Sequence, residues 1–468
     1  MRLLFSFVIL FPMIFGSPAA PPGGTIPPGT VPPAQVERPN VLLIVLDDAA
    51  PLLSSYGGPV HTPHMDALAA QGRRYSLAFA NSTGCNPSRV SFATGLLPLC
   101  VNTMSQTDWR AVMDGCTPGQ GTNVKTMYQT FSDAGYSTLA VGKIMHSSAQ
   151  QWPEFDESYF YAPGDWLPLI ANSPLHGLTE YYSIGTPLRD WGRLEDLRGH
   201  NGETFGEEHL TDWRITTDAL ARMGTLQEPF FLAVGLVGPH WPRYAPARLY
   251  DKYLGVPLPD VLMNDADDMP HRGRNLSSEN TQNRMVVRDI LSHRPVWQAF
   301  NAAYYASLEF ADEQIGRLLA AVPEDTVVVV WSDHGYHLGQ KLKVEKGALW
   351  RESYHIPFIV TGPGVQPEVI TDVTNSTEVY PMLLGLAGLT PTDGIDRTPI
   401  ADGFVAYDGH AAIDDGQYAL ILYNAATALQ KAQEFYDLQA DPLQWRNLGG
   451  AAPSVEYRQR LNEYLAGE

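Results

Sequence analysis

Two continuous apolar segments dominate the hydrophobic pattern of this chain. Residues 41–46 read VLLIVL and residues 326–331 read TVVVVW, and polar residues follow each segment directly. Short apolar runs rich in β-branched side chains are typical of strands buried on both faces, which occur in parallel sheets covered by helices. The pattern therefore predicts an α/β fold with a mostly parallel central sheet.

Helical, strand-like and loop patterns occupy other parts of the chain. HTPHMDALAAQG (61–72) predicts a helix that starts with proline and ends at Gly72. YALILY (418–423) and KAQEFYDL (431–438) predict two adjoining strands near the C-terminus. The polar stretch 264–281 is predicted to be a surface loop whose acidic run is solvated.

The N-terminus has the pattern of a secretory signal. Arg2 precedes an apolar run at 3–15 and then small residues, and the run is too short to span a bilayer comfortably. We expect residues 1–20 to be a signal peptide; the alternative is an uncleaved anchor, and the lack of a following cysteine argues against a lipoprotein. Residues 21–38 form a Pro/Gly-rich linker, so the folded protein is expected to begin near Pro39.

Composition and charge limit the function classes. The 468 residues are 44% hydrophobic and 18% charged, as in an ordinary globular protein. The net charge of −20, from 31 basic and 51 acidic residues, argues against broad electrostatic binding to nucleic acid or an anionic membrane. A polyanionic substrate would therefore need positive charge that is concentrated within its site.

Acidic residues follow both apolar strands. Asp47 and Asp48 come directly after the first strand, and Asp333 and His334 follow the second after one serine. In such sheets, ligands bind at the carboxyl ends of the strands. Three clustered carboxylates would repel one another unless a hard divalent cation joined them, and oxygen-rich ligation favours Ca²⁺ or Mg²⁺. Taken singly, either acidic pair is more simply explained as a loop or helix cap.

The segment CNPSRVSFATG (85–95) carries the most informative motif. It matches C-x-P-S-R-x-x-x-x-T-G at six fixed positions. Pro87 fits the first turn of a helix, because its ring already holds a helical φ. The free N–H groups and dipole of that helix would face an anion, and Arg89 would add a fixed positive charge. The alternative is a buried structural cysteine ahead of a helix.

This motif resembles the signature of the type I, formylglycine-dependent sulfatases. The resemblance implies that a dedicated maturation enzyme oxidises Cys85 to Cα-formylglycine, whose hydrate is the nucleophile that attacks the sulfur of a sulfate ester. It also implies that Asp47, Asp48, Asp333 and His334, with a formylglycine oxygen at position 85, hold one Ca²⁺; Mg²⁺ is the less favoured ion.

Three further segments resemble sulfatase site segments. VGKIMH resembles a G-K-x-x-H segment, which makes Lys143 and His146 candidates for neutralising sulfate and assisting the diol. AVGLVGPHWP resembles a strand followed by P-H-x-P, so His240 is expected to face the sulfate. Lys346 lies in the long segment that begins S-D-H-G and aligns with a site lysine whose charge would favour the departing alkoxide.

Among sulfatases, the chain most resembles the iduronate-2-sulfatase branch. That branch shares V-S-F-x-T-G after the catalytic cysteine, the P-H-x-P turn and D-H in place of D-N. Departures occur as well: the chain reads VEK where relatives often have a tryptophan before the lysine, and Gln340 and Lys341 stand where relatives often have Glu and His. These positions are expected to border the substrate pocket, so the resemblance does not identify the sugar of the substrate.

The resemblance also implies how the chain is organised. We expect an alkaline-phosphatase-like fold, with a catalytic domain at 39–390 and a C-terminal subdomain at 391–468 that carries a short antiparallel sheet and a helix. If Cys85 is converted, Cys100 and Cys116 remain to pair, and such a disulfide would contribute about 3 kcal/mol. Two buried free thiols are the alternative.

Three functional interpretations follow. The first is an exported sulfatase (periplasmic, secreted or lysosome-like) that acts on a sulfated sugar, such as a glycosaminoglycan-like fragment with a 2-O-sulfated uronic acid, and has a maturation enzyme as its partner. The second is a phosphonate monoester or phosphodiester hydrolase of the same superfamily, because some of those share the C-x-P-S-R cysteine. The third is a non-catalytic carbohydrate-binding relative. None involves nucleic acid or stable membrane insertion after signal cleavage.

Overall fold

The computed structural model describes residues 38–98, 124–146, 153–161, 191–196, 204–276, 287, 291–425 and 432–466. Their main sheet consists of β1 (Val41–Asp47), β2 (Arg73–Phe79), β3 (Ser137–Gly142), β4 (Glu157–Tyr159), β6 (Phe230–Pro239), β8 (Val327–Ser332), β11 (His355–Ile356), β12 (Phe358–Thr361) and β13 (Glu368–Asn375). The strand order is β11-β2-β12-β8-β1-β6-β3-β4, with β13 beside β2. Strands β8 to β4 in this order are parallel, whereas β12 runs antiparallel to both β8 and β2. The prediction of a mostly parallel α/β fold is confirmed.

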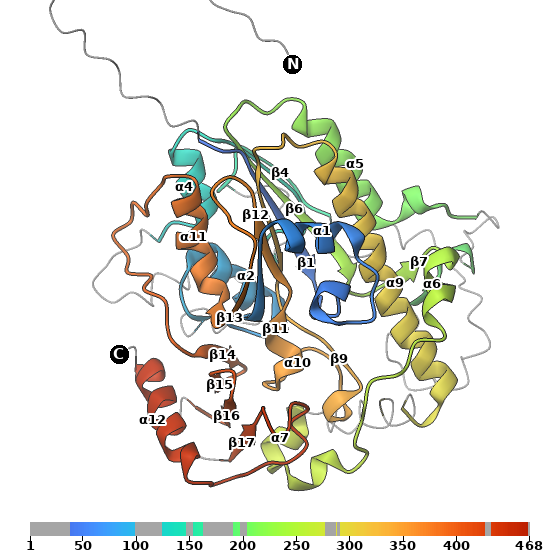
Figure 1. The fold of residues 1–468 in the computed structure, drawn as a ribbon, viewed down its shortest axis with the longest axis vertical. Helices are drawn as coiled ribbons and strands as arrows, with labels where there is room; N and C mark the ends of the chain where they lie inside the picture. The colour runs from blue at the N-terminus through green and yellow to red at the C-terminus, as the bar shows by residue number, and fades with distance from the viewer. Residues whose placement is uncertain are drawn as a thin grey trace, which may run out of the picture. The chain divides into compact units, whose positions relative to one another are not determined.

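Helices cover both faces of this sheet because its central strand is apolar on both sides. Leu42, Ile44 and Leu46 of β1 pack into one core, and the alternate residues of β1 pack into the other. Each of these side chains is at most 1% exposed, and burying one contributes about 1.5–3 kcal/mol. The first face is covered by α1 (Pro63–Gln71), α5 (Thr211–Met223) and α9 (Arg294–Leu319), and the second by α2 (Cys85–Thr94), α4 (Met127–Asp133) and α11 (Val379–Leu386) (Figure 1). The predicted helix with proline at its start is α1, and Gly72 is its C-cap residue, as expected.

A second sheet lies near the C-terminus. It is an antiparallel meander of β14 (Gly403–Tyr407), β15 (His410–Asp414), β16 (Tyr418–Leu422) and β17 (Gln433–Asp437). The two strands predicted at 418–423 and 431–438 are therefore confirmed as neighbours. Helix α12 (Pro453–Ala466) packs Tyr457 and Leu461 against the apolar face of this sheet.

Shorter elements connect these layers. Two small sheets pair β5 (Trp191–Arg193) with β7 (Arg243–Ala245) and β9 (His337–Leu338) with β10 (Val344–Glu345). The described residues also form α6 (Ala247–Tyr253), α7 (His271–Leu276) and α10 (Arg351–Tyr354). The 3-10 helices are η1 (Ser54–Tyr56), η5 (Leu194–Asp196), η6 (Glu207–His209), η7 (Asp265–Asp268), η8 (Gln340–Leu342) and η9 (Ser376–Glu378).

The prediction of a surface loop at 264–281 is wrong for its described part. Residues 264–276 contain η7 and α7, and Asp265 is only 2% exposed. Its Oδ1 lies 2.9 Å from Nζ of Lys341, which is itself buried. A buried carboxylate needs such a partner, so the pair explains why Asp265 enters the core, whereas Asp267 and Asp268 of the same acidic run are exposed, as predicted. Lys341 therefore acts in packing here rather than at an open pocket.

Several sequence predictions lie outside the described residues. These are the signal peptide at 1–20, all but the last residue of the linker, and both Cys100 and Cys116. Among the residues that are described, no helix combines the length and the apolarity needed to cross a membrane.

Candidate active site

Cys85 is the first residue of α2, a helix whose ten residues are all buried. The preceding Gly84 has extended backbone dihedrals, and Pro87 lies in the first turn, where its missing N–H is not needed. At the other end Gly95, with a φ of 69°, donates its N–H to the carbonyl oxygen of Ser91 at 2.8 Å. The sequence thus places Cys85 at the positive end of a buried helix dipole.

Cationic and acidic groups surround the Cys85 sulfur. Sγ lies 3.2 Å from Nε2 of His334, 3.9 Å from Oδ1 of Asp47 and 4.0 Å from Nζ of Lys143. Burial alone would raise the pKa of this thiol, but the positive charges of Lys143, Lys346 and His334 hold it well below its ordinary value. The side chain is only 8% exposed. The alternative of a structural cysteine in an apolar setting does not describe these surroundings.

The carboxylates meet because β1 and β8 are parallel neighbours. Leu46 is paired with Ser332, so the residues that follow the two strands lie side by side. The N–H of Asp48 donates to Oδ1 of Asp333 at 3.1 Å, and Asp48 has a φ of 66°, an uncommon conformation for a residue with a side chain. Asp47, Asp48 and Asp333 are each fully buried.

Arg89 and Lys143 balance two of these carboxylates. Arg89 donates from Nε to Oδ2 of Asp333 at 2.9 Å, and Lys143 donates from Nζ to Oδ2 of Asp47. Burial would raise the pKa of Asp47, but Lys143, His240 and Arg89 hold it well below its ordinary value. Burial and the charge of Asp47 outweigh Arg89 at Asp333, where the pKa is raised.

Lys346 forms an ion pair with the third carboxylate, that of Asp48. Its Nζ lies 2.6 Å from Oδ1 of Asp48, and the lysine side chain is 23% exposed. Burial would lower the pKa of Lys346, but Asp48, Cys85 and Asp47 raise it well above its ordinary value. This lysine is therefore a permanent cation that reaches solvent at the edge of the site.

The donor set fits a hard divalent cation. Ligand atoms lie within 4.8 Å of one another in two overlapping groups, Asp47/Cys85/Asp333/His334 and Asp47/Asp48/His240. Oδ2 of Asp48 is buried and has no hydrogen-bond partner among the described residues. Nη2 of Arg243 lies 3.8 Å away, too far for a hydrogen bond, and a buried carboxylate oxygen without one is costly unless a bound ion or water satisfies it. Carboxylate oxygens are the ligands that Ca²⁺ and Mg²⁺ prefer.

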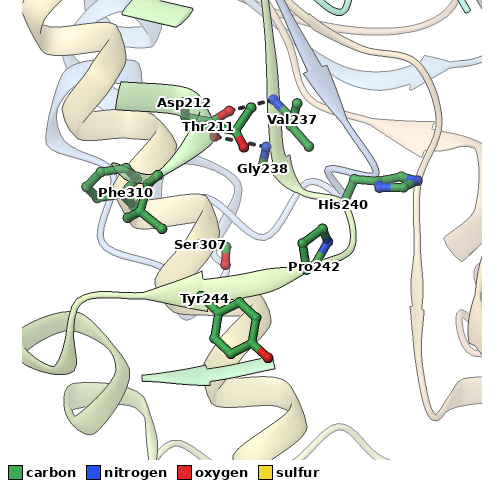
Figure 2. Close-up of a pocket in the computed structure, with 10 residues that line it drawn as sticks. Thr211, Asp212, Val237, Gly238, His240, Pro242, Tyr244, Ser307 and Phe310 are labelled. Atoms are coloured by element: carbon green, nitrogen blue, oxygen red, sulfur yellow. Dashed lines mark hydrogen bonds between the residues drawn. The ribbon is translucent and has the colours of Figure 1, made fainter. Parts of the chain in front are cut away.

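His240 follows β6 on a turn that a buried carboxylate holds. Asp212 accepts from the N–H of Val237 at 2.7 Å and from the N–H of Gly238 at 2.9 Å (Figure 2). Burial raises the pKa of Asp212 to about 6. The adjoining cavity has a volume of about 30 Å³, which suits a water molecule and not a sugar. His240 is one of the residues that line this cavity, and Figure 2 shows its ring extending away from Asp212 and Ser307.

The ring of His240 is held in one orientation. Nδ1 lies 2.6 Å from the carbonyl oxygen of Trp241, so Nδ1 carries the donated proton and a neutral ring has a lone pair at Nε2. Burial and the charge of Lys346 lower the pKa of His240 to about 4. The structure thus brings His240 beside Asp47 and Asp48, in the second group of clustered ligand atoms. His146 is half-buried, and within the described residues it has no hydrogen bond or ion pair to this cluster.

Arg243 is a site residue that the sequence reasoning missed. Its guanidinium carbon lies 4.3 Å from the ring centroids of Trp241 and Tyr336 and 4.9 Å from that of Tyr304. Nη2 lies 3.8 Å from Oδ2 of Asp48, and Nε donates to the carbonyl oxygen of Pro239. A buried guanidinium is stabilised by aromatic faces and by a carboxylate. The available signal was a lone charge in the otherwise uncharged run PHWPRYAP.

Comparisons with known proteins agree with this geometry. The sequence model of the family described as Sulfatase matches residues 39–389. The chain is 27% identical over 444 residues to a sulfatase from Formosa agariphila, which covers 88% of this chain and 83% of that protein. It is 29% identical over 356 residues to human iduronate 2-sulfatase, which covers 69% of this chain and 60% of that protein.

Solved structures share the fold. A 2-O GAG sulfatase superposes with a TM-score of 0.67 at 20% identity, covering 92% of each chain. A phosphonate monoester hydrolase from Silicibacter pomeroyi superposes with a TM-score of 0.66 at 19% identity, covering 92% of this chain and 95% of that one. These neighbours have the alkaline-phosphatase-like fold, which confirms the fold expected from the sequence.

Proposed function

This chain belongs to the sulfatase family and is a sulfuric ester hydrolase, and on that premise we propose that it removes sulfate from a sulfated sugar with a formylglycine at position 85 and one Ca²⁺. The observation that carries the proposal is the position of Cys85 at the N-terminus of α2. Its sulfur lies within 4.0 Å of atoms of His334, Asp47 and Lys143. An anion bound next to a nucleophile at position 85 would be stabilised by the N-terminus of α2 on one side and by buried cations on the other.

The chain's own residues are suited to hold a sulfate group. Arg89 and Lys143 place two buried positive charges beside position 85. When present, a formylglycine hydrate would supply the attacking hydroxyl, and Ca²⁺ would withdraw charge from the sulfate oxygens. The residues that would hold Ca²⁺ are Asp47, Asp48, Asp333 and His334, with an oxygen at position 85. His146 remains a candidate for assisting the diol.

The distribution of charge in this protein and the substrates named for similar proteins support the proposed substrate class. The net charge of −20 repels polyanions, whereas Arg89, Lys143 and Lys346 are gathered at one site. The similar proteins include an iduronate 2-sulfatase and a 2-O GAG sulfatase, which supports a glycosaminoglycan-like substrate with a 2-O-sulfated uronic acid. A phosphonate monoester or phosphodiester substrate is the second candidate, because a phosphonate monoester hydrolase shares the fold.

Parallel assays separate these two candidates. The mature chain is given a panel of defined sulfated oligosaccharides and, separately, phenyl phosphonate monoesters and phosphodiesters. We expect kcat/KM for at least one sulfated sugar to exceed that for every phosphorus substrate by about 10-fold or more. The two kinds of ester are both tetrahedral monoanions, so the difference must come from contacts with the sugar alcohol. A higher kcat/KM on a phosphonate or phosphodiester would contradict the proposal.

Breaking the ester bond leaves charge on the alcohol oxygen, which a sugar stabilises poorly and a nitrophenol stabilises by itself. Lys346 is partly exposed and permanently charged, so it is our candidate for stabilising the departing alkoxide. We expect Lys346→Ala to lower kcat/KM on a sulfated sugar by on the order of 10²-fold and to cost less on nitrophenyl sulfate. His240→Ala should also lower kcat/KM more on the sulfated sugar than on nitrophenyl sulfate. The difference between the two losses should be smaller than for Lys346→Ala, because a neutral His240 ring has no proton at Nε2.

The control is Lys125→Ala, which removes a lysine that pairs with Asp133 at the surface. This variant should leave both rates unchanged. Equal losses on the sugar and the aryl ester, for both Lys346→Ala and His240→Ala, would refute this assignment of the leaving-group side.

We also propose the setting in which the enzyme acts. The N-terminal pattern supports export with a signal peptide at 1–20 and a linker at 21–38, and a maturation enzyme that oxidises Cys85 is the implied partner. The division into a catalytic domain at 39–390 and a subdomain at 391–468 is supported by the change from the mixed sheet to the meander of β14 to β17.

A further inference from the structure

Four buried side chains form a compact set of metal ligands when position 85 is still a cysteine. Asp47, Cys85, Asp333 and His334 come from the end of β1, the start of α2 and the segment after β8, and their ligand atoms all lie within 4.8 Å of one another. The set contains one sulfur, one imidazole nitrogen and two carboxylate oxygens. The sulfur is the donor that distinguishes this set from the oxygen-rich ligand set proposed above for Ca²⁺.

The separations between these donor atoms approach those of a tetrahedral zinc site. Sγ of Cys85 lies 3.2 Å from Nε2 of His334 and 3.9 Å from Oδ1 of Asp47, and Nε2 lies 3.6 Å from Oδ1 of Asp333. Zinc bonds of about 2.0–2.3 Å in a tetrahedron place neighbouring donors roughly 3.3–3.5 Å apart. These three separations lie within about half an ångström of the tetrahedral values, and all four donor atoms lie within 4.8 Å of one another, so the side chains need to draw together around one ion.

The surrounding groups orient each ligand toward the centre of the set. Oδ2 of Asp47 accepts from Nζ of Lys143, and its Oδ1 faces Sγ. Oδ2 of Asp333 accepts from Nε of Arg89, and its Oδ1 faces Nε2 of His334. Nδ1 of His334 lies 3.1 Å from the carbonyl oxygen of Gly335, so Nδ1 donates there and Nε2 is the nitrogen that turns to Sγ. Outer hydrogen bonds of this kind are what fix first-shell ligands in zinc proteins.

We propose that the chain with an unconverted Cys85 binds Zn²⁺ through Asp47, Cys85, Asp333 and His334. Binding forms a Zn–S bond to the thiolate and a Zn–N bond to Nε2 of His334, and the proton held between Sγ and Nε2 is released to solvent. Conversion of Cys85 removes the sulfur and puts oxygen in its place, which turns a site for a borderline-soft ion into a site for a hard one. The same residues thus select different metals before and after maturation.

The test uses the full chain made without the maturation enzyme, with Co²⁺ as the spectroscopic probe for Zn²⁺. We expect Co²⁺ to give an intense near-ultraviolet thiolate-to-cobalt absorption, which added Zn²⁺ removes by displacement. The matched control is Cys85→Ser, which keeps the other three ligands and both remaining cysteines. It should lose this absorption, and its Zn²⁺ affinity by titration calorimetry should be lower by on the order of 10²-fold or more.

Two controls test whether the sulfur ligand is Cys85 and whether the Cys85 variant is folded. Cys100→Ser/Cys116→Ser should retain the cobalt absorption, because the sulfur ligand is Cys85. Circular dichroism of Cys85→Ser should match that of the parent, and Cys85→Ala serves as the comparison if the serine variant does not fold. An absent cobalt–thiolate absorption in the cysteine form, or an equal Zn²⁺ affinity in Cys85→Ser, would overturn the proposal. No sulfate ester enters these measurements, so their outcome is independent of the proposed sulfatase substrate.

Discussion

A chain in which Cys85 is replaced by Ser or Ala will show kcat for sulfate release lower by on the order of 10³-fold or more, with the fold intact. Position 85 lies at the centre of the site. When catalytic residues act together, removing the nucleophile alone abolishes nearly all of the rate enhancement that they provide together. Serine differs from cysteine by one atom, so α2 and its capping are kept. The wild type and the variant are each produced with the maturation enzyme, and the rate of sulfate release by each is then measured.

Peptide mass spectrometry gives the accompanying chemical readout. The wild-type peptide that contains position 85 should be about 18 Da lighter than its sequence predicts, because the side chain loses sulfur and hydrogen and gains a carbonyl oxygen. The Cys85→Ala peptide should have its unmodified mass. Full activity of Cys85→Ala, or an active wild type with an unmodified cysteine, would remove Cys85 from the mechanism.

Loss of the metal will be the second large effect. Asp47 lies in both groups of clustered ligand atoms, so Asp47→Ala removes a ligand that no neighbour can replace. We expect the bound Ca²⁺ measured by elemental analysis to fall from about one per chain to below about one tenth, and the rate to fall by on the order of 10²-fold or more. Treatment of the wild type with a calcium chelator should lower the rate similarly, and added Ca²⁺ should restore it.

The matched control for this prediction is Asp372→Ala, which removes an exposed carboxylate from β13. It should keep both the calcium content and the rate. A normal calcium content in both Asp47→Ala and Asp333→Ala would show that the ion is held elsewhere.

The sequence could predict the centre of this site because simple rules apply there. The apolar runs that became β1 and β8 each end in acidic residues, and parallel neighbours bring their carboxyl ends together. The motif at 85–95 likewise implied a helix with Pro87 in its first turn, and α2 has that form. These features depend on local pattern and on sheet geometry.

Other parts depend on packing between distant segments, which a single sequence does not reveal. The burial of Asp265 requires Lys341, which lies 76 positions later and has a φ of 57°. Arg243 is held by rings from three different segments and reaches Asp48, and nothing in its immediate neighbours indicates that contact. The sequence motifs concern the sulfate end of the site and contain no comparable rule for the alcohol end, and for that reason the sugar was not predictable.

The pairing of β1 with β8 also sets an order of events during synthesis. The two strands lie about 286 residues apart in sequence, and contacts of such long range form late in folding. Roughly 250 residues separate Cys85 from the end of β8, which takes about 12–50 s to synthesise at 5–20 residues per second. Once the sheet closes, α2 is buried and Cys85 is 8% exposed, so a modifying enzyme has little access to it. If Cys85 is converted as proposed, we expect the nascent chain to offer its cysteine for oxidation only during a limited interval, so that the timing of strand closure determines how much of the protein matures.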